Sequence, residues 1–296
     1  MIYNLGSINV DFCYQVPNLP VPGETLHATG FASGLGGKGA NQSVAAARAG
    51  ATVYHIGAVG TDGDQVIAQL AESGVDVSQI TRVSGPTGHA IIMVDGAGEN
   101  AIVVCAGANM RQDFDKLHAA LMQARLGDWL LLQNETSHQV EAARMAHAQG
   151  IKVAYSAAPF CADAARAVLP FTEVLLLNAV EAQQLSDALA MPVNALPVPY
   201  VVVTKGAQGA TWMDIAQRTA VDIPAFEVAS VDTTGAGDTF AGYMVAGLDA
   251  RLSPTLALTR ASAAAALSTT RHGTSQAIPD RLQVDAFLGN AASAPR

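Results

Sequence analysis

The stretch Trp129–Ala157, WLLLQNETSHQVEAARMAHAQGIKVAYSA, contains the pattern that decides the fold. An apolar run, WLLLQ, is followed by an alanine-rich segment with helical spacing, HQVEAARMAHAQG, and then by a second apolar run, IKVAYSA. Short apolar runs separated by helices indicate strands that are buried on both faces. The stretch therefore predicts a strand, a helix and a second strand that lies parallel to the first.

The same alternation recurs on both sides of this stretch. Strand patterns such as IYNLGSI, TVYHIGAVG, EVLLLN and YVVVTKG are interleaved with helical patterns such as NQSVAAARAG, QVIAQLAESG and AVEAQQLSDALA. Gly50, Gly74 and Gly150 each follow a helical pattern, which is typical of left-handed C-terminal caps. The sequence predicts a single α/β domain over residues 1–296, with a mostly parallel central sheet and helices on both faces.

Two segments near the N-terminal side break the alternation. GETLHATGFASGLGG and TGHAIIMVDGAGENAIVVCAGAN alternate apolar and polar residues without helical periodicity, and the second predicts a hairpin that turns at Asp95–Asn100. We predict a small β-sheet lid, formed by about residues 12–36 and 87–108 and inserted in the main domain. Exposed strand edges can pair between subunits, so we expect a homodimer through this lid.

Composition excludes several classes of function. The net charge is −9 and no Lys/Arg-rich run occurs, which argues against a nucleic-acid partner. No segment has the pattern of a secretion signal or the length of a bilayer span, so we expect no membrane partner. Cys13, Cys105 and Cys161 are widely spaced without a CxxC pair, which predicts reduced, buried thiols in a cytoplasmic protein.

The segment DTTGAGDTF, Asp232–Phe240, leads into a helix whose apolar face is Phe240, Met244 and Leu248. The first N–H groups of a helix have no internal partner, and small residues let an anion approach them closely. A carboxylate at Asp238 would repel a bound phosphate, but it makes sense as a general base for an attacking hydroxyl. The structural alternative is that the acid only favours the helix N-terminus while the glycines shape the turn.

Two further segments carry polar residues where a ligand could bind. In GLGGKGANQ, four glycines surround Lys38 without forming a Walker A motif, so the backbone can pass close to an anionic ligand. In GSINVDF, Asn9 and Asp11 are expected to share a face where the first strand ends, an arrangement suited to vicinal hydroxyls. A solvated lysine and an Asx turn are the structural alternatives.

The segments GSINVD, PGET, GGKGANQ, AGAN, LLQNE, VVTKGAQG and DTTGAGDTF occur together and in this order. On these motifs the chain resembles the PfkB family of carbohydrate and nucleoside kinases, ribokinases included, over essentially its whole length. The resemblance implies a ribokinase-like fold and the ATP-dependent phosphorylation of D-ribose to ribose 5-phosphate. It also implies Mg²⁺ as cofactor and K⁺ as activator.

The resemblance implies a role for each motif residue. Asp238 would be the general base, and the amides of Gly235, Ala236 and Gly237 would form an anion hole. The sugar would be held by Asn9, Asp11, Gly37, Lys38, Asn41 and Glu135. Nucleotide contacts would come from Asn178, Thr204, Gly206 and Gly209, and Glu181 would order the water around Mg²⁺. As a structural alternative, Asn178 and Glu181 form a helix capping box.

The implied monovalent-cation site departs from the family pattern. Its ligands would be Asp232 and the carbonyls of Thr234, Thr269, His272 and Gly273. The family often has a serine where this chain has Ala277, so one ligand is missing or replaced by water. A second departure is SAAPF, at 156–160, where ribokinases commonly have NPAP.

Other substrates and another class of protein remain open from the sequence. Sister kinases of this family act on fructose, deoxyribose, keto-deoxy sugar acids or nucleosides. A nucleoside needs an apolar slot for its base, and Phe12, Tyr14 and Phe31 are the only aromatic candidates near the lid, which favours a free sugar. A catalytically silent sugar-binding regulator is the alternative from another class, and the retention of Asp238 argues against it.

Overall fold

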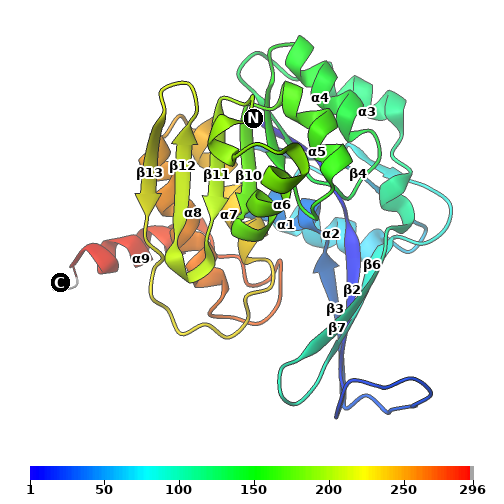
Figure 1. The fold of residues 1–296 in the computed structure, drawn as a ribbon. Helices are drawn as coiled ribbons and strands as arrows, with labels where there is room; N and C mark the ends of the chain where they lie inside the picture. Colours follow the sequence, from blue (N-terminus) through cyan, green and yellow to red (C-terminus); the bar gives the residue numbers. More distant parts are fainter. Residues whose placement is uncertain (294–296) are drawn as a thin grey trace.

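The computed structural model describes residues 1–293, and its strands form two sheets (Figure 1). In the larger, nine-stranded sheet, every pair of neighbours is parallel except at the β11–β12–β13 edge. This arrangement confirms the predicted mostly parallel sheet. Its strands, in spatial order, are β13 (Thr219–Ile223), β12 (Ala210–Asp214), β11 (Tyr200–Thr204), β10 (Val174–Asn178), β9 (Lys152–Ser156), β8 (Trp129–Leu132), β1 (Ile2–Leu5), β4 (Val53–Val59) and β5 (Ile80–Arg82).

Helices cover both faces of the large sheet because its strands are apolar on both sides. In β8, Leu131 packs into one core cluster, while Leu130 and Leu132 pack into the other. The first cluster includes residues of α1 (Lys38–Arg48), α2 (Asp64–Glu72), α7 (Ala236–Asp249), α8 (Pro254–Ser268) and α9 (Arg281–Ser293). The second includes residues of α3 (Phe114–Leu121), α4 (Gln139–Ala148), α5 (Ala162–Val168) and α6 (Ala179–Leu189).

The smaller sheet projects from the body of the protein (Figure 1). Its strands, in spatial order, are β3 (Gly30–Gly36), β2 (Asn9–Gln15), β6 (Gly88–Val94) and β7 (Asn100–Cys105). The β6–β7 hairpin turns at Asp95–Asn100, as predicted. One expectation is wrong: β1 ends at Leu5, so Asn9 and Asp11 lie on a separate strand of the small sheet and not at the end of the first strand.

Short 3₁₀ helices occupy several connections, namely η1 (Gly107–Met110), η2 (Leu169–Phe171), η3 (Val193–Ala195) and η4 (Gly206–Gln208). Three glycines that follow helices have left-handed φ angles, +101° at Gly50, +86° at Gly74 and +72° at Gly150, which confirms the predicted caps. Trp129 and Trp212 are buried, as expected of core residues.

The cysteines were predicted to be buried, and this is wrong. Cys105 and Cys161 are exposed and Cys13 is half-buried, although all three thiols are free. Cys105 ends an outer strand of the small sheet, where no helix layer covers it. Cys161 immediately precedes α5.

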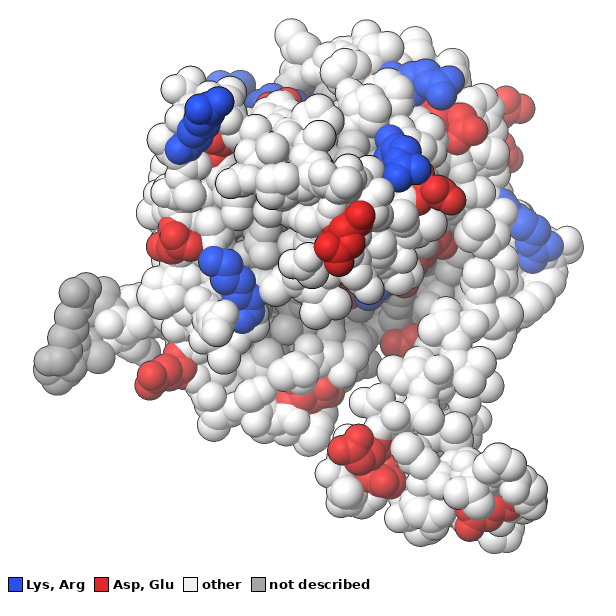
Figure 2. All heavy atoms as spheres, viewed as in Figure 1, with Lys and Arg blue, Asp and Glu red and all other residues white. Residues whose placement is uncertain are grey.

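Surface charge is sparse on the face drawn in Figure 2, where lysines and arginines are scattered singly and acidic side chains gather near the tip of the small sheet. Among residues 1–293, no helix combines the length and the apolar character that a membrane crossing requires.

Candidate active site

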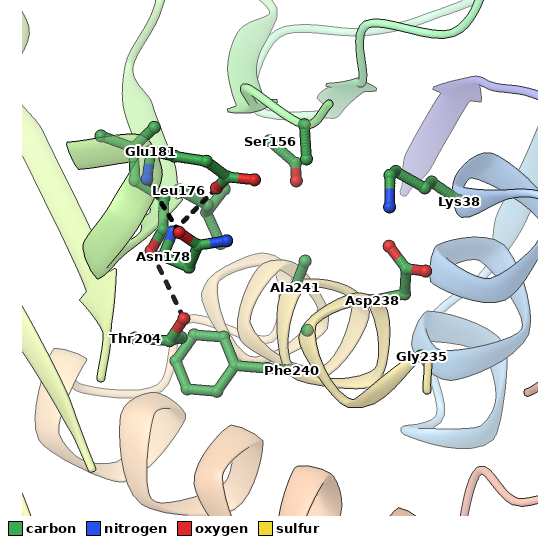
Figure 3. A pocket seen from close by; sticks show the side chains of 13 residues that line it. Lys38, Ser156, Leu176, Asn178, Glu181, Thr204, Gly235, Asp238, Phe240 and Ala241 are labelled. Carbon is green, nitrogen blue, oxygen red and sulfur yellow. Dashed lines mark hydrogen bonds between the residues drawn. The ribbon is translucent and has the colours of Figure 1, made fainter. Parts of the chain in front are cut away.

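A polar cavity lies where the carboxyl ends of β9, β10 and β11 face the start of α7. Lys38, Asn178, Glu181, Thr204 and Asp238 line it, and Figure 3 shows the Lys38 amine pointing at the Asp238 carboxylate. Ligands of parallel α/β sheets bind at this edge of the sheet. The fold therefore brings motif residues from four separate segments of the chain to one cavity of about 140 Å³.

Asp238 lies in the first turn of α7. The helix begins after Gly235, whose backbone is left-handed with a φ of +75°. The Asp238 side chain is only 9% exposed and accepts two hydrogen bonds from side-chain amides. Asn41 Nδ2 donates to Oδ2 at 3.2 Å, and Gln42 Nε2 donates to Oδ1 at 2.9 Å. The negative charge of Asp238 raises the pKa of Lys38. The carboxylate is thus held in the cleft beside the lysine.

A glycine contact between two helices places these amides against Asp238. A Cβ atom at Gly242 of α7 would lie 2.5 Å from both Ala45 Cβ and the Gln42 carbonyl oxygen of α1. Any larger residue would force the helices apart. Because Gly242 is one turn along α7 from Asp238, this close approach brings Asn41 and Gln42 within hydrogen-bond distance of the carboxylate.

The predicted anion hole is partly different in the structure. The Ala236 amide donates to the Thr233 carbonyl at 3.2 Å, so it closes the turn instead of facing a ligand. The role of Ala236 in the anion hole stays a prediction. Within residues 1–293, no partner is assigned to the amides of Gly235 and Gly237, and a Cβ at Gly237 would meet no atom within 4 Å. These two amides are open to an anion.

Glu135 joins the Lys38 loop to the turn after β1. Its Oε2 accepts from the Ser7 hydroxyl at 2.5 Å and from the Lys38 amide at 3.1 Å. Burial raises the pKa of Glu135, although the Ser7 hydrogen bond opposes this effect. The two loops meet because Gly39 and Gly6 have no side chains: a Cβ at Gly39 would lie 2.3 Å from the Gly6 Cα.

Asp11 and Asn9 reach the same region from the small sheet. Burial, together with the charges of Glu135 and Asp238, raises the pKa of Asp11 to about 6. Asn9 Oδ1 accepts from Asn109 Nδ2 at 2.8 Å. A Cβ at Gly37, φ +91°, would lie 3.1 Å from the Asn9 amide, so the glycine loop passes directly beside β2.

A larger cavity of about 760 Å³ adjoins the first, and the two share Thr204, Gly237 and Phe240. Gly206 and Gly209 also line the larger cavity, so they lie beside Thr204, with which they were predicted to bind the nucleotide. The cavity contains two residues that sequence reasoning missed. Phe226 lies in a loop without a motif, and Ser262 lies in an alanine-rich helix with a buried Oγ that has no partner among the described residues.

Asn178 and Glu181 form the capping box that was one interpretation of this motif. Asn178 Oδ1 accepts from the Glu181 amide, and Glu181 Oε2 accepts from the Asn178 amide, both at 2.8 Å. Burial raises the pKa of Glu181. Its other carboxylate oxygen points into the cavity in Figure 3, so capping does not exclude a second role.

The comparisons with known proteins agree with this geometry. The model of the family described as pfkB family carbohydrate kinase matches residues 1–281. The protein belongs to this family. The ribokinase of Haemophilus influenzae is 36% identical over 301 residues, covering 97% of this chain and 98% of that protein. The deoxyribokinase of Salmonella typhi is 31% identical over 309 residues, covering 96% and 97%.

A solved relative has the same fold as this carbohydrate kinase. The structure of Arabidopsis thaliana ribokinase, complexed with ribose and ATP, superimposes with a TM-score of 0.85 at 29% identity. The match covers 97% of this chain and 98% of that one. The ribokinase-like α/β fold with a small additional sheet is therefore shown.

The residues predicted to bind a monovalent cation are near one another but are engaged with the backbone. Asp232 Oδ1 accepts from the Thr234 amide at 2.9 Å, and Oδ2 accepts from the Gly273 amide at 3.0 Å. The Thr269 carbonyl accepts from the amides of Val231 and Asp232. Each of these oxygens keeps a further lone pair after accepting an N–H group, so the hydrogen bonds do not exclude K⁺, and the cation site stays a prediction.

Proposed function

We propose that this carbohydrate kinase transfers the γ-phosphoryl group of ATP to the primary hydroxyl of D-ribose, giving ribose 5-phosphate and ADP. The observation that carries the proposal is the position of Asp238. It lies between the open amides at the start of α7 and the polar cluster that contains Lys38 and Glu135. Two relatives support the choice of substrates. The Arabidopsis relative is a ribokinase complexed with ribose and ATP, and the H. influenzae relative is a ribokinase.

In this proposal the sugar lies between the glycine loop and the small sheet. Asp11 and Glu135 accept hydrogen bonds from sugar hydroxyls, while Asn9, Asn41 and Lys38 supply donors or acceptors beside them. The buried Oδ1 of Asn41 has no partner among the described residues, which suits a ligand hydroxyl as its donor. Gly37 contributes its backbone, because no side chain fits beside β2.

Phosphoryl transfer then depends on the position of Asp238. Asp238 takes the proton of the primary hydroxyl as the oxygen attacks the γ-phosphorus, and ADP leaves on the opposite side. The amides of Gly235 and Gly237 stabilise the charge on the transferring group. Lys38 keeps its positive charge beside Asp238, and it screens the carboxylate from the incoming phosphate.

The nucleotide extends from this point into the larger cavity along Thr204, Gly206 and Gly209. Glu181 fits a role in holding hydrated Mg²⁺, since one of its oxygens caps α6 while the other points into the cavity. When bound, the ion neutralises charge on the β- and γ-phosphates. Asn178 positions Glu181 through the capping box and does not need to contact phosphate itself.

We further propose that the small sheet closes over the sugar and mediates a homodimer. Exposed apolar side chains concentrate on it, including Phe31, Ile102, Val103 and Val104. Such a patch is unfavourable in water and is typical of an interaction surface. Closure would exclude water, which otherwise competes as the phosphoryl acceptor.

Deoxyribose is the second candidate acceptor, because the S. typhi deoxyribokinase is nearly as similar as the ribokinases. A nucleoside is less well supported. Phe12 stacks on Phe31, which in turn contacts Tyr14, and residues 12 and 14 of β2 point to the opposite face from Asp11. The aromatic rings therefore offer no base slot beside the sugar residues.

A panel of acceptors tests the proposal. ADP release is measured with ribose, deoxyribose, fructose, a keto-deoxy sugar acid and a nucleoside, and the product is assigned by ³¹P NMR. Ribose is expected to have the highest kcat/KM, with phosphate on its primary hydroxyl. Preference for another acceptor contradicts the substrate assignment, and no turnover with any of them favours a sugar-binding regulator.

A further inference from the structure

A buried chain of side-chain amides extends from Asp238 into the protein interior. Gln42 Nε2 donates to Asp238 Oδ1 at 2.9 Å, and Gln42 Oε1 accepts from Gln133 Nε2 at 2.8 Å. Gln133 Nε2 also donates to Asn4 Oδ1 at 3.0 Å. Gln42 and Asn4 are fully buried, Gln133 is 1% exposed, and none of the three lines either cavity. These amides are therefore placed to act through Asp238 and not on a ligand.

The far end of the chain is fixed by a backbone carbonyl. Asn4 Nδ2 donates to the Gly39 carbonyl and to Ser43 Oγ, each at 2.8 Å. A carbonyl oxygen only accepts, so Asn4 must turn its nitrogen toward Gly39 and its oxygen toward Gln133. Gln133 must then present N–H to Asn4 and to Gln42. Gln42 in turn has only one orientation left, with its N–H toward Asp238.

A buried histidine fixes the same direction from the other side of Asn4. His55 Nδ1 lies 2.8 Å from Ser43 Oγ, and Nε2 lies 3.1 Å from the Gly6 carbonyl oxygen. Burial lowers the pKa of His55 to about 4, so the ring is neutral near pH 7. A neutral ring that donates to Gly6 from Nε2 must accept at Nδ1. Ser43 therefore donates to His55 and accepts from Asn4.

An unpaired oxygen of Gln133 indicates that the donor-to-acceptor direction of these hydrogen bonds matters. Gln133 Oε1 is buried and has no hydrogen-bond partner within residues 1–293. A buried acceptor without a donor is unfavourable, and most folded proteins avoid it. Turning the Gln133 amide over would not relieve it, because Oε1 would then face the oxygens of Asn4 and Gln42.

We propose that Gln42 is a positioning residue that holds the Asp238 carboxylate toward the acceptor hydroxyl, and that Gln133 and Asn4 set the direction of its amide. The inference rests on the proposed function, because it takes Asp238 to be the base. Gln42 binds Oδ1 and Asn41 binds Oδ2, so two donors fix the plane of the carboxylate. Small errors in such a position have large effects on the rate of the chemical step.

The test reverses the donor-to-acceptor direction of these hydrogen bonds with a side chain of the same shape. Gln133→Glu, once ionised, replaces the N–H donors by oxygens that only accept, so Gln42 must turn its nitrogen toward residue 133 and its oxygen toward Asp238. A protonated residue 133 would keep one O–H donor, so kcat is measured as a function of pH and the fall is expected where residue 133 is ionised. We expect kcat to fall about 100-fold while the KM values for sugar and ATP stay essentially unchanged. Gln133→Met removes the donors without adding a charge and is expected to have a smaller effect. Gln69→Met, a half-buried glutamine on α2, is the matched control and should leave kcat unchanged.

The assays use whichever acceptor the wild-type enzyme phosphorylates best, so an error in the substrate does not decide the result. Normal kcat in folded Gln133→Glu, or a rise in KM alone, overturns the inference. If this variant does not fold, Gln42→Met carries the same expectation and the same contradiction. A crystal structure of the variant gives a readout without turnover: the Asp238 carboxylate should be rotated, and an unchanged carboxylate overturns the inference even if wild type phosphorylates no sugar.

Discussion

The two sheets contribute different kinds of residue to the same site. Asp238 and Glu181 lie in the first turns of helices that pack on the nine-stranded sheet, and each carboxylate accepts hydrogen bonds there. Asp11 lies on the four-stranded sheet, where Phe31 is 59% and Val103 is 61% exposed. In the proposed mechanism, the large sheet positions the reacting groups, and the small sheet supplies groups that bind and cover the sugar. We therefore expect changes on the first to lower kcat and changes on the second to raise KM.

We expect the largest effect at Asp238, which lies at the start of a helix that packs on the large sheet. Asp238→Asn keeps the shape of the side chain but removes the base, so kcat should fall about 10³-fold while the KM for sugar changes little. ATP binding, measured by calorimetry, should be retained. Near-normal turnover would show that another group accepts the proton.

The matching change on the small sheet is Asp11→Asn. The amide can accept only through its one oxygen and loses the charge, so the KM for the sugar should rise roughly 10- to 100-fold. Steady-state kinetics at saturating ATP measure this. A fall in kcat with an unchanged KM would mean that the small sheet takes part in the chemical step, and the contrast between the two sheets would fail.

A pH profile sharpens the same contrast. The pKa of Asp11 is raised to about 6, so its carboxylate is lost as the pH falls below that value. The KM for the sugar should rise below about pH 6, by up to about tenfold for each pH unit, and stay constant above it. Asp11→Asn should abolish this dependence. A profile that is the same in both proteins would contradict the assignment.

Stability should change in the opposite sense in the free enzyme. Burial favours the neutral form of Asp11, so its contribution to stability is complete below its ordinary pKa of 3.8 and is lost as the pH rises through about 6. Asp11→Asn should therefore raise the melting temperature at pH 7.5, measured without sugar. A lower melting temperature would mean that the ionised group has a partner in the free protein.

The smallest effect concerns the exposed side of the small sheet. Val103→Asp should weaken the proposed dimer at least about tenfold, because a charge is buried in an apolar contact. Leu126→Asp is the control. Leu126 is 84% exposed, and it does not belong to a strand of the small sheet. Analytical ultracentrifugation measures both. A wild-type protein that is monomeric at all concentrations would remove the dimer from the proposal, and a dimer that is equally stable in Val103→Asp would contradict an interface on the small sheet.

The sequence was most informative where one local segment determines the outcome. The capping box at Asn178 and Glu181, the helix that begins after Gly235, and the hairpin turn at Asp95–Asn100 were all predicted from adjacent residues. Each depends on hydrogen bonds between neighbours in the chain, so local pattern is sufficient.

What the sequence could not predict depends on contacts between distant segments. Gln42 is part of a motif, but its link to Gln133 and Asn4 exists only after three segments have met. Asn9 was placed on the wrong element, because IYNLGSI was interpreted as one continuous strand, whereas β1 ends at Leu5. The thiol of Cys105 was expected to be buried, and no pattern in the sequence shows that the small sheet lacks a covering layer.

A crystal structure with ribose and a non-hydrolysable ATP analogue tests the central claim most directly. We expect the primary hydroxyl of the sugar within about 2.6–3.2 Å of the Asp238 carboxylate, with γ-phosphate oxygens at the amides of Gly235 and Gly237. A primary hydroxyl bound instead to Asp11 or Glu135, with Asp238 out of reach, would contradict the role of Asp238 as the base.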